Sequence, residues 1–246
     1  MDLIIKKALD GTLDFTKLDG WDWSRLLAAQ PQFADQCDWS KLDGDDWDIL
    51  LSNRPQFAEY CDWSLLHGVD WVSLLSVQPQ LHTHCPWDRI EGWDWANLLR
   101  AQPQFAELCD FTKLCGGSWS FLIQECPRFA DRCDWSKLDG DDWSDLLREW
   151  PRFYNLCDWS KLSGNDWIFL LRERPQFIEY CTQYVFEYGC GHGSRTIYID
   201  VRNPDVIHIG CFKGTEEEAV AAISKKYSGQ AAADYITKVE SCFAKL

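Results

Sequence analysis

The chain of 246 residues returns to the same side chains every 24 residues, without insertions. Tryptophan, glycine, proline and cysteine all follow this interval. The tryptophans are Trp23, Trp47, Trp71, Trp95, Trp119, Trp143 and Trp167, and the cysteines are Cys37, Cys61, Cys85, Cys109, Cys133, Cys157 and Cys181. A strict period of this length indicates a solenoid, in which each repeat buries its apolar side against its neighbours.

The repeat at residues 133–156 shows what the period encodes. Trp143, Leu146 and Leu147 follow Asp142 with the i, i+3, i+4 spacing of one helical face. We therefore expect a helix with Asp142 as its N-cap. Pro151 predicts the end of this helix and the start of a second, short one, because proline fits the first turn of a helix.

After the second helix, the sequence predicts one further turn. Gly164 then predicts a tight turn with positive φ. The predicted fold class is mainly α: an α-solenoid of seven 24-residue helical-hairpin repeats, followed by a small α+β C-terminal domain. A leucine-rich repeat can also run 24 residues, but it needs an alternating Leu-x-Leu strand that does not recur here.

The period sets the expected domain boundaries. Residues 1–181 form the predicted repeat domain, with residues 1–12 as an N-terminal lid. Residues 182–246 form the predicted C-terminal capping domain, with the order β-β-β-α-α. Its strands are expected at 182–188, 195–201 and 206–212, and its first helix after the capping box of Thr215 and Glu218.

The charge of the chain is concentrated in the repeats. The formal net charge is -15, and residues 1–181 contain 17 Lys and Arg against 31 Asp and Glu. Such an acidic surface argues against nucleic acid as a partner, because phosphate backbones are held by Lys and Arg. It permits basic protein partners.

The sequence also bears on the compartment. No apolar run approaches the roughly 20 residues of a membrane helix, so no membrane partner is expected. No basic leader followed by an apolar stretch is visible at the start. Equivalent cysteines in stacked repeats should lie roughly 9–11 Å apart, too far for a disulfide. Reduced thiols predict a cytoplasmic protein.

Two motifs could carry chemistry. Cys190 and His192 could form a nucleophile–base pair, or could bind a metal with His208 and Cys211. Neither zinc-ligand spacing nor a positioned base is visible, so a plain hairpin turn is favoured. The acidic cluster at 43–46 lacks the spacing of a calcium loop. We therefore expect no catalytic residue, no metal and no cofactor.

Positions that vary between repeats are free for recognition, whereas fixed positions serve stacking. Aromatic and large apolar side chains at variable positions are candidates for partner contacts. These candidates are Trp21, Ile49, Tyr60, Trp93, Phe121, Phe169 and Tyr180.

The unit Cys-Asp-Trp-Ser-Lys-Leu-Asp-Gly at 133–140, with the Asp-Trp-x-x-Leu-Leu motif after it, resembles tandem repeats of uncharacterised bacterial proteins. The segment 207–215 is similar to a small C-terminal unit of other bacterial repeat proteins. Neither resemblance implies an activity. We expect a non-enzymatic scaffold, monomeric or weakly homo-oligomeric, that binds a protein or peptide. The alternatives are a self-assembling structural protein, an acidic mimic that binds a basic protein, and an enzyme at Cys190.

Overall fold

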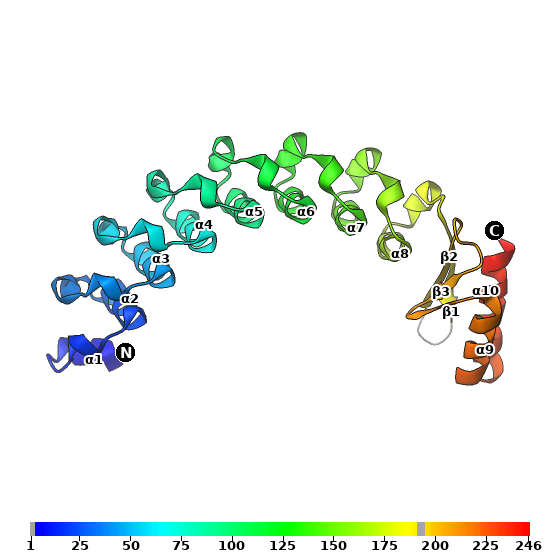
Figure 1. The fold of residues 1–246 in the computed structure, drawn as a ribbon, viewed down its shortest axis with the longest axis horizontal. Coiled ribbons are helices and arrows are strands. Elements are labelled where there is room, and N and C mark those ends of the chain that lie inside the picture. The colour runs from blue at the N-terminus through cyan, green and yellow to red at the C-terminus, as the bar shows by residue number, and fades with distance from the viewer. Residues whose placement is uncertain (1–2, 191–194) are drawn as a thin grey trace. The chain divides into compact units, whose positions relative to one another are not determined.

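The structure, a computed structural model, describes residues 3–190 and 195–246. The chain forms two compact units, Met1–Cys133 and Asp134–Leu246. It is mainly helical, with the predicted helical repeats and a small sheet near the C-terminus (Figure 1).

Each repeat begins with one α-helix of ten residues that starts at the periodic glycine. A shorter helix, α1 (Leu3–Leu9), precedes them. The repeat helices are α2 (Gly20–Ala29), α3 (Gly44–Asn53), α4 (Gly68–Val77), α5 (Gly92–Ala101), α6 (Gly116–Glu125), α7 (Gly140–Glu149) and α8 (Gly164–Glu173). Neighbouring helices pack directly, from α2 to α6 in the first unit and α7 against α8 in the second.

Each of α2 to α7 is followed by two 3-10 segments, where the sequence predicted a second helix and a turn; α8 is followed by one, and one further short segment precedes α2. The longer segments are Pro31–Gln36, Pro55–Tyr60, Pro79–His84, Pro103–Glu107, Pro127–Arg132, Pro151–Leu156 and Pro175–Tyr180. The shorter ones are Phe15–Lys17, Trp39–Lys41, Trp63–Leu65, Trp87–Arg89, Phe111–Lys113, Trp135–Lys137 and Trp159–Lys161. Six residues or fewer are too few for a stable α-helix, and the tighter 3-10 geometry is common in such short pieces.

An aromatic stack forms the core of each repeat. In the third repeat helix, α4, Trp71 is fully buried, and the ring of Trp63 stacks on it with 5.4 Å between ring centroids. The equivalent pairs lie 5.3–5.6 Å apart with interplanar angles of 11–19°. Among the described residues, none of the seven buried indole N–H groups has a hydrogen-bond partner. The ring is therefore retained for its volume and stacking.

Polar clamps fix the spacing between repeats. The ammonium group of Lys41 donates to the backbone oxygens of Thr16 (3.0 Å) and Leu18 (2.6 Å), one repeat earlier. Lys161 does the same with Ser136 and Leu138, at 2.6 Å each. These bonds satisfy carbonyl groups that the short 3-10 segments leave without a partner.

A second clamp comes from the residue before the proline. Gln78 and Gln102 donate through their amides to the carbonyl groups of Ser52 (2.8 Å) and Ser76 (2.7 Å) in the preceding helix. Arg54 makes the equivalent bond through its guanidinium, to Ala28 at 2.9 Å. Each of these bonds links residues 26 positions apart, so an insertion within a repeat would break it.

The predicted N-cap of the repeat helix was wrong by three residues. Asp139, rather than Asp142, caps α7, and its carboxylate accepts from the backbone N–H of Asp142 at 3.0 Å. The Asp142 carboxylate in turn accepts from the Asp139 backbone N–H at 3.1 Å. The apolar spacing located the helical face, but this reciprocal capping box adds a first turn ahead of it.

The prediction of positive φ at Gly164 was also wrong. Gly164 lies in the first turn of α8, and the described glycines with positive φ are Gly11, Gly189, Gly210 and Gly229. Glycine is required at the helix start because the next repeat approaches closely. A Cβ on Gly140 would lie 2.4 Å from a carboxylate oxygen of Asp166, and one on Gly20 would lie 2.0 Å from Asp46.

The C-terminal part contains four antiparallel strands in sequential order rather than three. They are β1 (Tyr184–Cys190), β2 (Arg195–Asp200), β3 (Ile207–Ile209) and β4 (Phe212–Gly214). The predicted third strand at 206–212 is divided because Gly210, at φ 61°, reverses the chain. The helices α9 (Glu216–Lys226) and α10 (Gly229–Ala244) follow, and the predicted box of Thr215 and Glu218 caps α9.

One face of this sheet packs on the two helices through an isoleucine-rich core. Ile197, Ile199 and Ile207 are fully buried there, together with Val239 of α10. Glu187 is buried at the same interface, where it accepts hydrogen bonds from Lys238 at 3.0 Å and Ser241 at 2.5 Å. Burial raises its pKa, but the bonds from Lys245, Ser241 and Lys238 outweigh burial and lower that pKa to about 2.

The other face of the sheet is aromatic and docks on the last repeat. Tyr198 stacks on His208 at 4.6 Å, and a Cβ on Gly164 would lie 2.2 Å from its ring. Tyr198 therefore occupies, beside Gly164, the place that an aspartate of the next repeat occupies beside Gly20, Gly44, Gly68 and Gly140. The sheet therefore ends the stack of repeats, with a tyrosine instead of an aspartate in contact with the helix-start glycine.

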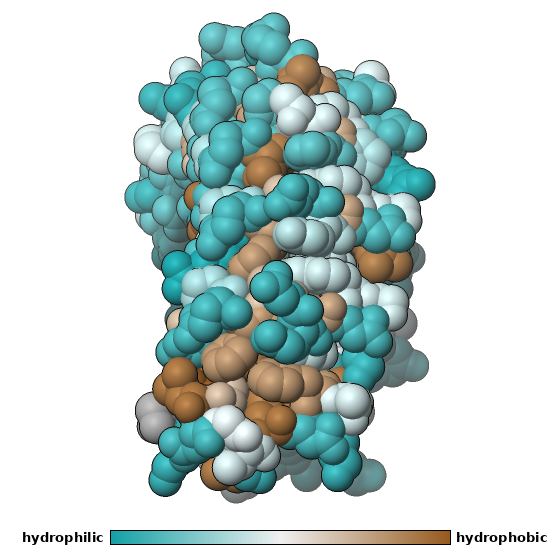
Figure 2. All heavy atoms as spheres, turned by 90° about the vertical axis from the view of Figure 1, so that its left-hand side faces the viewer, coloured by the Kyte–Doolittle hydropathy of each residue, from teal (hydrophilic) through white to brown (hydrophobic). Residues whose placement is uncertain are grey.

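The predicted N-terminal lid forms only in part. The helix α1 packs on α2 and buries Ala8, but Leu3 and Leu9 remain 64% and 51% exposed. Figure 2 shows the resulting apolar area at the lower end of the view, over α1.

We expect Trp95→Ala to destabilise the first unit by roughly 3–5 kcal/mol, because it leaves a large cavity in the core. Trp93→Ala removes an exposed ring two residues earlier and should cost less than about 1 kcal/mol. Urea unfolding followed by circular dichroism measures both. Equal losses for the two variants would contradict the described core.

The contribution of Asp46 to the stability of the repeats should increase as the pH falls from 7 towards 4. Burial is the main cause that raises the pKa of Asp46 to about 6, and the nearby carboxylates of Asp43 and Asp19 add to it. A folded-state pKa above the unfolded one favours folding below the unfolded pKa, and this contribution is lost as the pH rises through 6.

Asp46→Asn keeps a hydrogen-bond acceptor and should stabilise the chain at pH 7 by roughly 1–2 kcal/mol, with a flatter pH profile. Asp35→Asn removes the same charge at an exposed position and is the control. Melting temperatures between pH 4 and pH 7 measure the effect. A steeper profile for Asp46→Asn would refute it.

The contact between Gly164 and Tyr198 should show in a double-mutant cycle. Gly164→Ala alone should cost roughly 1–3 kcal/mol, because the added methyl group overlaps the tyrosine ring. In a Tyr198→Ala background the same change should be neutral or stabilising, because alanine favours the helix over glycine. Additive losses in urea unfolding would show that the two residues do not touch.

Candidate binding surface

The exposed sides of α4, α5 and α6 carry a group of apolar and aromatic side chains, which we name the helix face. It consists of Val69, Val77, Trp93 and Phe121. Val69 is 66% exposed, Val77 58% and Trp93 51%. The ring of Phe121, half-buried, packs against Trp93 at a centroid distance of 5.9 Å. The structure thus brings together two of the predicted site residues, Trp93 and Phe121.

A cation lies beside this pair. The guanidinium carbon of Arg100 lies 5.9 Å from the centre of the Phe121 ring. Arg100 and Trp93 both belong to α5, so the two helices hold an aromatic, apolar and cationic group on one rigid surface. Val69 and Val77 were not predicted. Both valines are exposed, and both stand where another repeat has a polar residue, Asp45 or Asn53. This difference between repeats is visible in the sequence and could have identified them.

Three other predicted residues occupy the same side of their helices but do not join the cluster. Trp21 in α2 is 51% exposed, and the guanidinium of Arg25 lies 5.5 Å from its ring centre. Ile49 in α3 is half-buried. Phe169 in α8 is exposed and belongs to the second unit.

Tyr60 and Tyr180 lie on a different surface. Tyr60 stacks on Trp39 at 4.6 Å, and Trp39 stacks on the buried side of α3 through Trp47 at 5.5 Å. Tyr180 makes the same contact with Trp159, at 4.7 Å. These tyrosines therefore lie across the core from the exposed helix side, along the 3-10 segments. Part of their surface serves the stack rather than a partner.

Five of the periodic cysteine thiols are buried or half-buried. Burial raises the pKa of Cys37, Cys61, Cys85, Cys109 and Cys157 to about 12. A thiol of this kind is a poor nucleophile at neutral pH. None of these five cysteines forms a disulfide.

The motif at Cys190 and His192 cannot be placed as a site. The backbone of Cys190 ends β1, and His192 lies outside the described residues. His208 instead stacks on Tyr198. Within residues 3–190 and 195–246, no three His, Cys, Asp or Glu side chains are grouped so that they could hold a metal ion.

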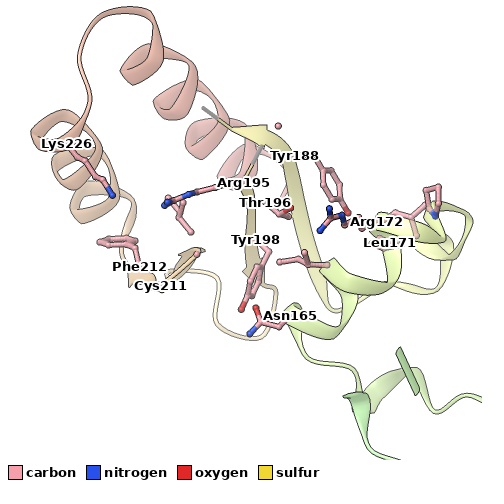
Figure 3. A pocket seen from close by; sticks show the side chains of 16 residues that line it. Asn165, Leu171, Arg172, Tyr188, Arg195, Thr196, Tyr198, Cys211, Phe212 and Lys226 are labelled. Carbon is pink, nitrogen blue, oxygen red and sulfur yellow. The ribbon is translucent and has the colours of Figure 1, made fainter. Parts of the chain in front are cut away.

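A groove in the second unit was missed by the sequence analysis. It lies between α8, the ends of the strands and α9, with a volume of about 1200 Å³ (Figure 3). Its residues come from four separate segments of the chain, and no short motif marks them. The available signal was the near balance of charge in residues 182–246, which hold 7 Lys and Arg against 8 Asp and Glu, whereas the repeats are strongly acidic.

Across the described part of the chain, no helix has both the length and the apolar character needed to cross a bilayer. No protein-family model matches this chain, and no curated protein and no solved structure matches it.

Proposed function

We propose that this chain is a non-enzymatic binding protein whose helix face recognises a protein or peptide. The observation that carries this proposal is the adjacent, outward-facing pair of Trp93 and Phe121, beside Arg100, on fully packed helices. Tryptophan and arginine are enriched among the residues that dominate binding energy at protein interfaces.

The repeat scaffold favours this use of the surface. Trp95, Leu98 and Leu99 bury the opposite side of α5 completely, so the exposed side is held rigid without contributing to the core. A surface that is already ordered loses little conformational entropy on binding. The partner expected from this chemistry presents an apolar anchor to Trp93 and Phe121, with a carboxylate or carbonyl group near Arg100.

A photo-crosslinking amino acid at position 93 should capture one specific partner in cells, whereas the same amino acid at the equivalent position 45 should not. With the identified partner purified, Trp93→Ala should weaken binding by at least about tenfold, which corresponds to about 1.4 kcal/mol. Isothermal titration calorimetry measures the Kd.

Asp45→Ala is the matched control, because residue 45 occupies the same place in α3. It should leave the Kd unchanged within about twofold. Equal crosslinking from positions 45 and 93 would contradict the proposal. Products that contain only further copies of this chain would favour self-assembly instead.

A further inference from the structure

The groove in the second unit continues into a smaller cavity of about 240 Å³ between the sheet and α9. The two cavities share four lining residues, Arg195, Ile209, Phe212 and Lys226. Together they form one continuous groove, which begins at α8, crosses the strand ends and reaches α9.

The charge of this groove is opposite to that of the chain. Arg172, Arg195 and Lys226 line it, and no Asp or Glu is among the described residues that do. The whole chain has 39 acidic and only 24 basic residues. An all-cationic lining is therefore not what the composition predicts for an ordinary patch of this surface.

Within the described residues, none of these three cations forms an ion pair with a carboxylate. Arg148 in the same unit, by contrast, pairs with Glu173 at 2.7 Å. Figure 3 shows the ends of Arg195 and Lys226 pointing towards each other, near Phe212. Two unpaired cations above an aromatic ring form a place where a carboxylate can be held.

The third cation, Arg172, lies at the other end, beside Tyr188 (Figure 3). Between the two ends the lining is mixed but mainly apolar, with polar groups such as Thr196 (Figure 3). Ile168, Leu171 and Ile178 contribute from the last repeat, and Ile178 is 49% exposed. The groove thus has cations at both ends of a mainly apolar stretch.

We propose that this groove binds an acidic peptide segment that carries an apolar side chain between its carboxylates. A compact anion such as phosphate would contact one end and leave the apolar stretch exposed to water. The volume of about 1200 Å³ also exceeds the roughly 300–1,000 Å³ of usual small-molecule sites. This inference goes beyond the proposed function, because the groove belongs to the second unit and the helix face to the first.

The probe is a short fluorescent peptide in which Glu alternates with Phe and Leu, titrated into the full chain at physiological salt. At that ionic strength, repulsion from distant carboxylates is screened beyond about 8 Å. Fluorescence anisotropy should show saturable binding. A peptide with Lys in place of Glu, and one with Ser in place of Phe and Leu, should both bind at least about tenfold more weakly.

Arg195→Glu should weaken binding of the Glu-Phe-Leu peptide by at least about tenfold, and so should Lys226→Glu. The matched control is Lys225→Glu, which makes the same charge change on α9 at a residue that does not line the groove. All three residues are exposed, and unchanged melting curves show that the variants fold. Trp93→Ala should keep full binding, which separates this test from that of the helix face.

A second readout is the thiol of Cys211, which is exposed and lines the groove, whereas the exposed Cys115 belongs to the first unit. The bound peptide should slow alkylation of Cys211 and leave Cys115 unaffected. Equal weakening by Lys225→Glu and Arg195→Glu would overturn the proposal. So would tighter competition by inorganic phosphate than by the peptide, or self-association of the chain that the peptide does not displace.

Discussion

Stacking of one aromatic ring on a buried tryptophan is the interaction on which every repeat depends. Each repeat offers its core one buried indole, two large aliphatic residues of the α-helix, one further leucine or isoleucine, and one phenylalanine or leucine. This is too little for a fold of 24 residues alone. The indole must therefore be covered by neighbouring helices as well as by the aromatic ring of the short 3-10 segment that stacks on it. Lysine and glutamine side chains donate to backbone carbonyl groups of the preceding repeat at a fixed separation along the chain. An insertion would break these hydrogen bonds, which explains why the period has none.

Much of the fold could be read from the sequence, because periodic residues report packing directly. Trp143, Leu146 and Leu147 identified the buried helical face. The start of the helix was harder to predict, because the cap Asp139 lies four residues before Trp143 and contributes no apolar residue to the pattern. The role of Gly164 was missed for a different reason: the atoms that exclude a side chain there belong to Tyr198, more than thirty residues away.

The candidate surfaces likewise include one that the repeat pattern indicated and one that it did not. Comparing repeats identified Trp93, which is exposed, and Phe121, which is half-buried, because each occupies a position that varies while its neighbours do not. The groove of the second unit could not be found in this way. Arg172, Arg195 and Lys226 come from a repeat helix, a strand and a capping helix, so only the folded chain makes them neighbours.

The tyrosine that replaces an aspartate at the last glycine has a consequence for how such chains acquire their length. A further repeat could not be appended directly after α8, because its aspartate would overlap Tyr198, which already occupies the space beside Gly164. Duplication or loss of units is therefore compatible with the fold only upstream of this contact. The sheet of the C-terminal domain thus closes the stack at α8.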